Sequence, residues 1–245
     1  MTLFRRLLLA VRQNTLPRAT GFRLRQFAYA NTHSGDHYLK LSPRMLRRLL
    51  EQPMSFSIDV VSVCNLECPT CPVANWPKES WTGATGIMDA ALLHQLIRKA
   101  LSECLVGNID LFAYTEPLLH PRLPELIAIV KSYGLRCKLS TNLNVMRDAD
   151  AVLRAEPDEI RISVSGFHQD TYGVTHAGGD IEVVKRHMRT LAEARQRLGS
   201  RTDVRVFFHK YRTNLDDLPL MKEFAASLGL DLTSAGRHSF RWRKC

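Results

Sequence analysis

The sequence lacks any long hydrophobic run. Its 245 residues contain nothing close to the 18 or so consecutive apolar residues of a membrane span. The apolar run at residues 7–11 is only five residues long and lacks the small-residue cleavage site of a secretory signal peptide. We therefore expect a cytoplasmic protein. At this length, with 45% hydrophobic and 24% charged residues, one globular core is the default expectation.

Acidic residues are almost missing from both ends of the chain. Residues 1–50 hold ten Lys and Arg but one acid, Asp36, and residues 237–245 hold four Lys and Arg and no acid. The stretch between is close to neutral, although the whole chain carries +10. Nucleic acid is therefore not the expected partner, because a dedicated binder spreads basic residues through its fold. The amphipathic residues 1–15 are expected to dock on the chain's own core or to contact an anionic membrane surface.

Cysteine is scarce too, and three of the six cysteines fall in one octapeptide. Cys64, Cys68 and Cys71 form the run C-N-L-E-C-P-T-C, which is too crowded for a disulfide framework. Structural zinc needs four ligands, and no second Cys or His pair lies nearby, so zinc is the weaker alternative. Three thiolates can instead hold three irons of a cubane iron–sulfur cluster and leave the fourth iron open to a substrate or cofactor.

Strand-like and helix-like runs alternate from residue 57 onward. Repeated β–α units force parallel strands, so we expect an α/β fold, a partial (β/α)6 TIM-like barrel. The apolar periodicity stops after residue 233, which predicts an incomplete sixth unit. The expected domains are a basic, partly helical segment at 1–54, the core at 55–233 and a disordered basic tail at 234–245. The expected strands are 57–63, 108–114, 135–140, 159–165, 203–209 and 230–233, and the expected helices are 89–102, 122–133, 147–155, 181–198 and 215–228.

Four motifs in order make the chain resemble the radical SAM superfamily over roughly residues 55–233. The hallmark is the C-x-x-x-C-x-x-C loop after the first strand. A-Y-T-E-P at 113–117, S-T-N-L at 140–143 and R-I-S-V-S-G at 161–166 stand where the family has its G-G-E-P motif, its T-N-G run and its fourth strand. The resemblance is closest to the branch with cofactor-maturation and peptide-modifying members. The chain departs from the family pattern at Thr70, Tyr114, Thr115 and Leu143.

The resemblance implies an enzyme with one [4Fe–4S] cluster on Cys64, Cys68 and Cys71 and with S-adenosylmethionine (SAM) as its cofactor. In the family, SAM binds the open iron, and its reductive cleavage gives methionine and a 5′-deoxyadenosyl radical that abstracts hydrogen from a substrate. The implied partners are a small-molecule or peptide substrate, which the sequence does not identify, and an electron donor such as flavodoxin or ferredoxin.

Every motif is expected at the C-terminal end of a strand, where barrel-like α/β folds build their sites. The resemblance implies that Thr115 and Glu116 contact the SAM ammonium. It implies that Asn142 and Ser163 contact the SAM carboxylate and ribose, with Ser165 a further cofactor contact. Lone histidines are more often structural, but four of them are candidates to face the same pocket. These histidines are His120, His168, His176 and His209.

Two rival functions remain open from the sequence. A nucleic-acid-modifying radical SAM enzyme is favoured by the basic N-terminal segment and disfavoured by the neutral body. A truncated, non-catalytic relative that binds a metal or cluster would account for the incomplete last unit. Metal analysis and an assay for SAM cleavage separate the second rival from an active enzyme.

Overall fold

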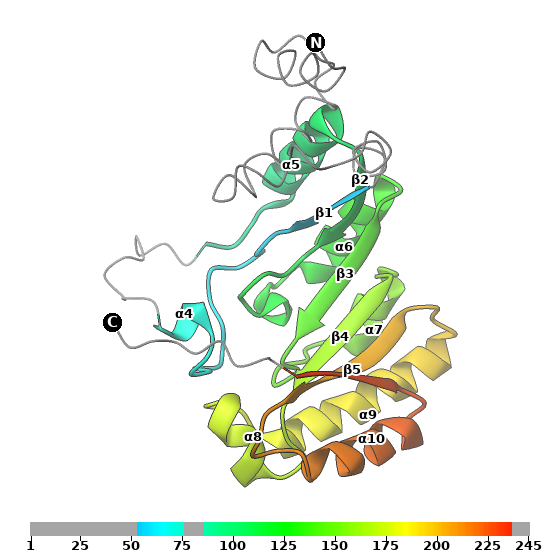
Figure 1. The fold of residues 1–245 in the computed structure, drawn as a ribbon. Helices are drawn as coiled ribbons and strands as arrows, with labels where there is room; N and C mark the ends of the chain where they lie inside the picture. Colours follow the sequence, from blue (N-terminus) through cyan, green and yellow to red (C-terminus); the bar gives the residue numbers. More distant parts are fainter. Residues whose placement is uncertain (1–52, 76–85, 237–245) are drawn as a thin grey trace, which may run out of the picture. The chain divides into compact units, whose positions relative to one another are not determined.

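The structure is a computed structural model that describes residues 53–75 and 86–236 (Figure 1). The chain divides into two compact units, and each is described by itself. The smaller unit joins the residues up to Phe56 to Ala91–Asn108, and the larger joins Ser57–Ala90 to the residues from Ile109 onward. The expected amphipathic start at 1–15 lies outside the described residues, as do residues 237–245 of the tail expected at 234–245, whereas residues 234–236 belong to the last strand, β6 (Asp231–Gly236).

Strands and helices alternate along the described chain, and the six strands lie in one sheet in the order β1-β2-β3-β4-β5-β6. Strands that are neighbours in both sequence and space, joined by helical crossovers, build an open α/β sheet of the partial-barrel kind. The expected α/β fold is therefore confirmed. The strands are β1 (Met54–Ser57), β2 (Val106–Asp110), β3 (Arg136–Thr141), β4 (Glu159–Val164), β5 (Asp203–Lys210) and β6 (Asp231–Gly236). The helices are α4 (Pro72–Asn75), α5 (Ala90–Glu103), η4 (Pro117–Leu119, a 3-10 turn), α6 (Leu123–Ser132), α7 (Ala149–Arg154), α8 (Gln169–Thr175), α9 (Ile181–Leu198) and α10 (Asp217–Ser227).

In the smaller unit, the segment after α5 returns the chain to the side of β1. The backbone N–H of Met54 donates to the carbonyl oxygen of Leu105 at 2.7 Å. Position 107 requires glycine, because a Cβ there would lie 2.6 Å from the Cβ of Pro53. The absent side chain of Gly107 thus allows the two segments to approach closely.

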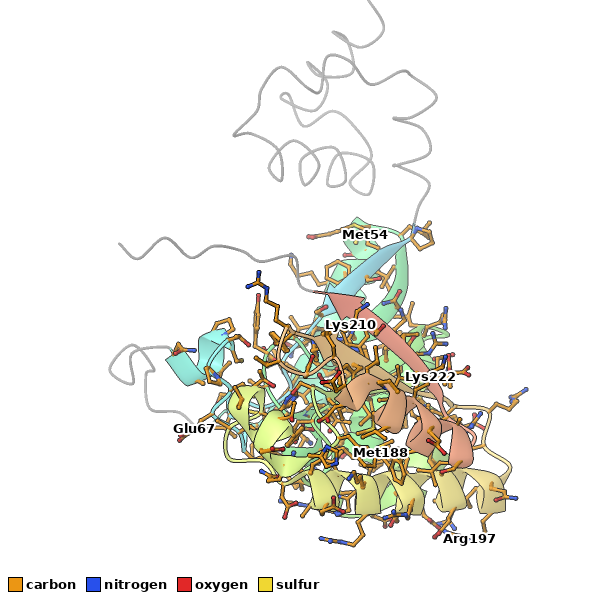
Figure 2. The ribbon with its side chains drawn as sticks, turned by 60° about the horizontal axis from the view of Figure 1, so that its bottom comes forward. Met54, Glu67, Met188, Arg197, Lys210 and Lys222 are labelled. Carbon is orange, nitrogen blue, oxygen red and sulfur yellow. The ribbon has the colours of Figure 1, made fainter. Side chains whose placement is uncertain are left out.

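The larger unit is built on β3 to β6, which pair in parallel register. Side chains alternate across β4: Ile160, Ile162 and Val164 are buried on the helix side, and the side chains between them face the other way. Helix α6 packs on β3, α10 packs on β5 and β6, and α7 packs against α9. Figure 2 labels Met188 and Arg197 on α9. Met188 is fully buried, whereas Arg197 is exposed.

The first two strands are shorter than the sequence predicts. The strand expected at 57–63 is wrong beyond Ser57, since 58–63 form an extended connection with one antiparallel bridge, Val61 to Ile87. The strand expected at 108–114 ends at Asp110. After β2 ends, the carboxylate of Asp59 accepts the N–H groups of residues 113–115, which are therefore not available to a strand ladder.

The short helices α4 and α8 and the 3-10 turn η4 were not predicted. The segment before α9, expected as a loop, contains α8, and Tyr172 of this helix is fully buried. The sixth strand runs to Gly236, three residues past its expected end. The prediction of an incomplete sixth unit concerns the residues after Gly236, which lie outside the described residues. Among the described helices, none has both the length and the apolar character needed to cross a membrane.

Candidate functional site

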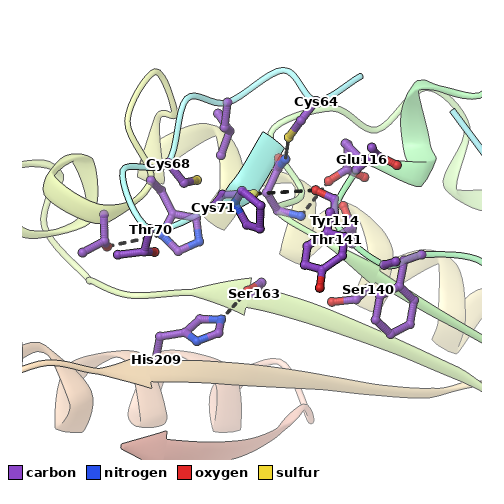
Figure 3. A pocket seen from close by; sticks show the side chains of 18 of the residues that line it. Cys64, Cys68, Thr70, Cys71, Tyr114, Glu116, Ser140, Thr141, Ser163 and His209 are labelled. Carbon is purple, nitrogen blue, oxygen red and sulfur yellow. Dashed lines mark hydrogen bonds between the residues drawn. The ribbon is translucent and has the colours of Figure 1, made fainter. Parts of the chain in front are cut away.

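A cavity of about 410 Å³ opens in the larger unit where the ends of the parallel strands meet the cysteine loop (Figure 3). The lining side chains come from that loop, from the segments after β2 and β3, from β4 and its following helix, and from the end of β5. They are Cys64, Leu66, Cys68, Thr70, Cys71, Pro72, Phe112, Ala113, Tyr114, Thr115, Glu116, Ser140, Thr141, Asn142, Arg161, Ser163, Thr175, His176, His209 and Tyr211.

The cysteine loop is held by one backbone hydrogen bond to the segment after α8 and by one within the loop. The N–H of Glu67 donates to the carbonyl of Ala177 at 2.9 Å, and the N–H of Cys71 donates to the carbonyl of Cys68 at 3.0 Å. The side chain of Asn75, at the end of α4, donates to the carbonyls of Pro69 and Cys71, both at 2.8 Å. These bonds turn the loop tightly enough for all three thiols to border one cavity.

All three cysteines are free thiols, and the surroundings of Cys64 and Cys68 disfavour their bare thiolates. Burial, followed by the charges of the neighbouring cysteines, raises the pKa of Cys68 to about 11. Burial also raises the pKa of Cys64, with Glu116 and Cys71 adding to the effect. Cationic iron would reverse this balance, because metal binding favours the thiolate.

The donor set fits a cluster better than it fits one zinc ion. In residues 53–75 and 86–236, no group of three His, Cys, Asp or Glu converges as ligands of a single metal ion must. In a cubane each thiolate takes its own iron, so the three sulfurs need not meet at one point. Three free thiols border one cavity, and the described part of the chain shows no converging fourth ligand, as an open [4Fe–4S] site requires.

Asp59 fixes the segment after β2, and sequence reasoning missed it. Its Oδ1 accepts the N–H groups of Ala113, Tyr114 and Thr115 at 2.9, 3.0 and 3.0 Å, and the hydroxyl of Thr115 at 2.7 Å. The Tyr114 carbonyl lies 3.9 Å from the Cys71 sulfur. The signal available in the sequence was an acid within an otherwise apolar segment, S-I-D-V-V.

Glu116 lines the cavity, but both of its carboxylate oxygens face backbone donors. Oε1 accepts the N–H of Leu118 at 3.0 Å and Oε2 accepts the N–H of Asn142 at 2.8 Å. Burial raises the pKa of Glu116 to about 7, against the opposing effect of these hydrogen bonds. Glu116 therefore ties the segment after β2 to the segment after β3.

Asn142 reaches toward the cysteine loop. Its Nδ2 donates to Oδ1 of Asn65 at 3.0 Å and lies 3.7 Å from the Cys64 sulfur. The next residue, Leu143, has a φ of 54°, a left-handed conformation that glycine adopts without strain. Leu143 stands where the family resemblance has glycine. It is fully buried, so packing compensates for the backbone cost.

The two serines of β4 and its end take different places. Ser163 lines the cavity and hydrogen-bonds to Nε2 of His209 at 2.6 Å, as Figure 3 shows. Ser165 does not line the cavity. It is fully buried, and its hydroxyl bonds to Nδ1 of His176 at 2.6 Å and to Thr175.

Two of the four candidate histidines line the cavity and two do not. His176 and His209 line the cavity, and burial, followed by the charge of His209, lowers the pKa of His176 to about 3. That ring is therefore neutral at physiological pH. His120 bonds to the Met88 carbonyl at 2.9 Å, and His168 bonds to Asp217 at 2.9 Å, both outside the cavity lining.

Comparison with known proteins decides the family. The family model described as "Radical SAM superfamily" matches residues 58–212, well over half of the chain. The chain belongs to the radical SAM superfamily. Membership implies a [4Fe–4S] cluster and SAM, and the residues of the cavity fit that cluster.

Two relatives by sequence are also radical SAM proteins in the cofactor-modifying and cyclase branches. A tungsten-containing aldehyde ferredoxin oxidoreductase cofactor-modifying protein of Pyrococcus furiosus is 25% identical over 184 residues, 71% of this chain and 48% of the relative. A probable GTP 3′,8-cyclase of Methanococcus maripaludis is 26% identical over 178 residues, 71% of this chain and 56% of the relative. The chain thus spans about half the length of each.

Two solved structures share the fold. SuiB of Streptococcus suis, bound to S-adenosylmethionine, has a TM-score of 0.60 at 11% identity, with 89% of this chain and 52% of that chain covered. The protein anSMEcpe, with bound AdoMet, has a TM-score of 0.58 at 16% identity, with 78% of this chain and 54% of that chain covered. At these identities the likeness is one of fold.

The expected cofactor contacts meet in one place, with one exception. Thr115, Glu116, Asn142 and Ser163 all line the cavity that the three cysteines border, whereas Ser165 turns away from it. Their roles toward SAM stay predictions. Besides Asp59, sequence reasoning missed Arg161, a charged residue in the middle of a strand that lines the same cavity.

Proposed function

We propose that this chain is a radical SAM enzyme that uses the cavity for reductive SAM cleavage and for hydrogen abstraction from a substrate. The observation that carries the proposal is the meeting of three free thiols with the polar strand ends in one cavity. When bound, the cluster and SAM supply the electron transfer and the radical chemistry. The protein would bind and orient the cluster, SAM and the substrate, and it would exclude water from the cavity.

The residues that would hold the cluster are Cys64, Cys68 and Cys71. The segment after β2 would meet the SAM amino group: the Thr115 hydroxyl donates its proton to Asp59, so its oxygen lone pairs remain available to accept from an ammonium. Ser163 and the side chain of Asn142 offer hydrogen bonds for the carboxylate and ribose.

An external reductant is needed, and we propose a flavodoxin- or ferredoxin-like donor. Free thiols at all five described cysteines fit a reducing compartment such as the cytoplasm. For the substrate, the resemblance to a cofactor-modifying relative and to a fold neighbour that was crystallised with its precursor peptide supports a small molecule or a peptide.

The test is anaerobic reconstitution followed by iron and sulfide analysis and by assay of 5′-deoxyadenosine after reduction with dithionite. Cys68→Ala should lose the cluster and SAM cleavage, because two thiolates do not hold a cubane. Cys104→Ala is the matched control, since Cys104 is buried away from the cavity and should leave the cluster intact. Wild-type protein that holds one zinc and no iron would refute the proposal. A cluster without SAM cleavage would favour the non-catalytic alternative.

A further inference from the structure

Arg161 is a cation fixed inside the cavity by three different strands or strand ends. It lies on β4, on the same face as Ser163, and both side chains line the cavity. Its guanidinium carbon lies 5.1 Å from the centre of the Phe112 ring and 5.0 Å from the centre of the Phe207 ring. Its Nε donates to the hydroxyl of Ser140 on β3 at 3.1 Å.

These contacts occupy one edge and the faces of the guanidinium group and leave the edge with its two terminal nitrogens uncovered. Cation–π contacts with two rings and one hydrogen bond at Nε fix the plane of the group. The two terminal nitrogens of Arg161 form no hydrogen bond to any described residue, and neither is a buried atom without a partner. They therefore keep a solvent-accessible fork of N–H donors at the cavity wall.

The charge of Arg161 is not neutralised by a close partner. No described carboxylate lies within ion-pair distance of it, although the fields of Glu159 and Asp110 reach it. Burial lowers the pKa of Arg161, with those two acids acting in the opposite direction. Arg161 is the one Lys or Arg among the described residues that line the cavity. The one acid in that lining is Glu116, whose oxygens already accept backbone N–H groups.

We propose that the terminal nitrogens of Arg161 form an anion subsite that binds a carboxylate or phosphate group of the substrate. A planar, preoriented pair of N–H donors matches the two oxygens of such a group. A partly desolvated cation without a close counter-ion gains more from an incoming anion than an exposed one does. This inference rests on the proposed function for the identity of the bound molecule as substrate.

The SAM carboxylate is the other source of the same chemistry, and the depth of Arg161 argues against it. Arg161 precedes Ser163 by two residues, so it lies about 7 Å farther from the C-terminal end of β4. The cysteines that would hold the cluster lie beyond the C-terminal strand ends, and the residues proposed to contact SAM, Thr115, Asn142 and Ser163, lie at or beyond those ends. An anion at Arg161 therefore belongs to a molecule that enters deeper in the cavity.

The experiment measures anion binding and SAM chemistry separately in the same variants. Inorganic phosphate and malonate are titrated into the full chain by calorimetry, with and without a reconstituted cluster and SAM. The variants are Arg161→Met and Arg161→Lys, with Arg189→Met as the matched control. Arg189 also stacks on a phenylalanine, Phe224 at 4.9 Å, but does not line the cavity.

We expect the wild type to bind at least one of the two anions and Arg161→Met to bind it at least tenfold more weakly. Arg161→Lys should fall between them, because it keeps the charge and loses the fork. SAM affinity should be retained in the Arg161 variants, and substrate-free 5′-deoxyadenosine formation should match the wild type in Arg189→Met. Thermal unfolding shows which variants are folded, and Arg161→Lys carries the test if Arg161→Met is not.

Three outcomes overturn the inference: no saturable binding of either anion by the wild type, equal binding by folded Arg161 variants, or loss of SAM affinity in those variants. The last would assign Arg161 to the SAM carboxylate. Absence of SAM cleavage in the wild type would instead refute the proposed function. Anion binding to the protein without cluster or SAM would still be measured in that case, so the two failures are distinguishable.

Discussion

Oε2 of Glu116 accepts the backbone N–H of Asn142 at 2.8 Å, and this bond joins the segment after β2 to the segment after β3. Both segments line the cavity, and Asn142 also approaches the Cys64 sulfur. One buried carboxylate thus connects the polar residues of two strand ends with the cysteine loop.

Replacing Glu116 should therefore disturb structure and cofactor binding together. Glu116→Ala leaves the N–H groups of Leu118 and Asn142 without their acceptor in a buried place, so we expect a loss of about 2–3 kcal/mol in the free energy of unfolding. SAM affinity should fall roughly tenfold or more while the cluster is retained. Urea unfolding and equilibrium SAM binding check this. Glu125→Ala, an exposed glutamate of α6, should change neither. A stable variant with unchanged SAM affinity would remove Glu116 from the site.

Replacing Asp59 should likewise lower both stability and SAM affinity, because Asp59 holds residues 113–115 in place. Asp59→Ala removes the acceptor of three consecutive N–H groups at residues 113–115, so we expect it to lower the free energy of unfolding by about 2–3 kcal/mol. SAM affinity should fall as well, because Thr115 loses its anchor. Asp170→Asn is the control, since Asp170 bonds only to its neighbour Thr171 and should cost less than 0.5 kcal/mol or so. Unchanged stability of Asp59→Ala would show that residues 113–115 hold their conformation unaided.

Alanine substitutions at Gly166, just before α8, and at Gly173, within α8, should have different effects on stability. A Cβ at Gly166 would lie 2.5 Å from the backbone nitrogen and 2.8 Å from the Cα of Tyr172, so Gly166→Ala must displace α8. We expect it to destabilise the fold by about 1–3 kcal/mol and to weaken SAM binding, because α8 leads into Thr175 and His176 of the cavity wall. A Cβ at Gly173 would lie 3.2 Å from Nε2 of Gln169, whose amide is held by hydrogen bonds to Gly179 and Ile181. The gain in helix propensity from Gly173→Ala is therefore offset by this contact, and we expect the stability to change by less than about 1 kcal/mol. Thermal unfolding of both variants tests the contrast, which equal shifts would contradict.

Local signals in the sequence predicted the long helices well. The helix expected at 181–198 is confirmed at both ends, because Asp180 accepts the N–H groups of Glu182 and Val183 and Gly199 closes it at a φ of 59°. The early end of β2 and the helix α8 were missed for the opposite reason. They depend on the Asp59 carboxylate, which bonds across more than fifty residues, and on the burial of Tyr172, and no short stretch of sequence reveals either.

The same distinction holds for the site. The order of strands and motifs predicted that the cysteines, Glu116, Asn142 and Ser163 would meet, since parallel strands bring their C-terminal ends to one edge. Ser165 was placed by the same alternation as Ser163, but β4 ends at Val164 and the chain turns there. Its hydroxyl then bonds to His176 instead of facing the cavity.

Asp158, in the turn between α7 and β4, should give the stability of the fold a specific dependence on pH. Its Oδ2 accepts from Nζ of Lys131 and from the N–H of Cys137, both at 2.7 Å. Burial raises the pKa of Asp158, but those two hydrogen bonds and the charges of Lys131 and Arg136 outweigh burial and hold it below 3.8. The lowered pKa means that this carboxylate stabilises the fold fully above pH 3.8 or so and loses that effect as the pH falls through the folded-state pKa. Asp158→Asn should therefore lower the free energy of unfolding by about 1–3 kcal/mol at pH 7 and by the same amount at pH 5, with the difference shrinking only below about pH 4. Urea unfolding of both proteins at pH 7, 5 and 4 measures this, and a Lys131→Met, Asp158→Asn double-mutant cycle isolates the ion pair. A difference that already shrinks between pH 7 and pH 5 would show that another group, not Asp158, carries the pH dependence.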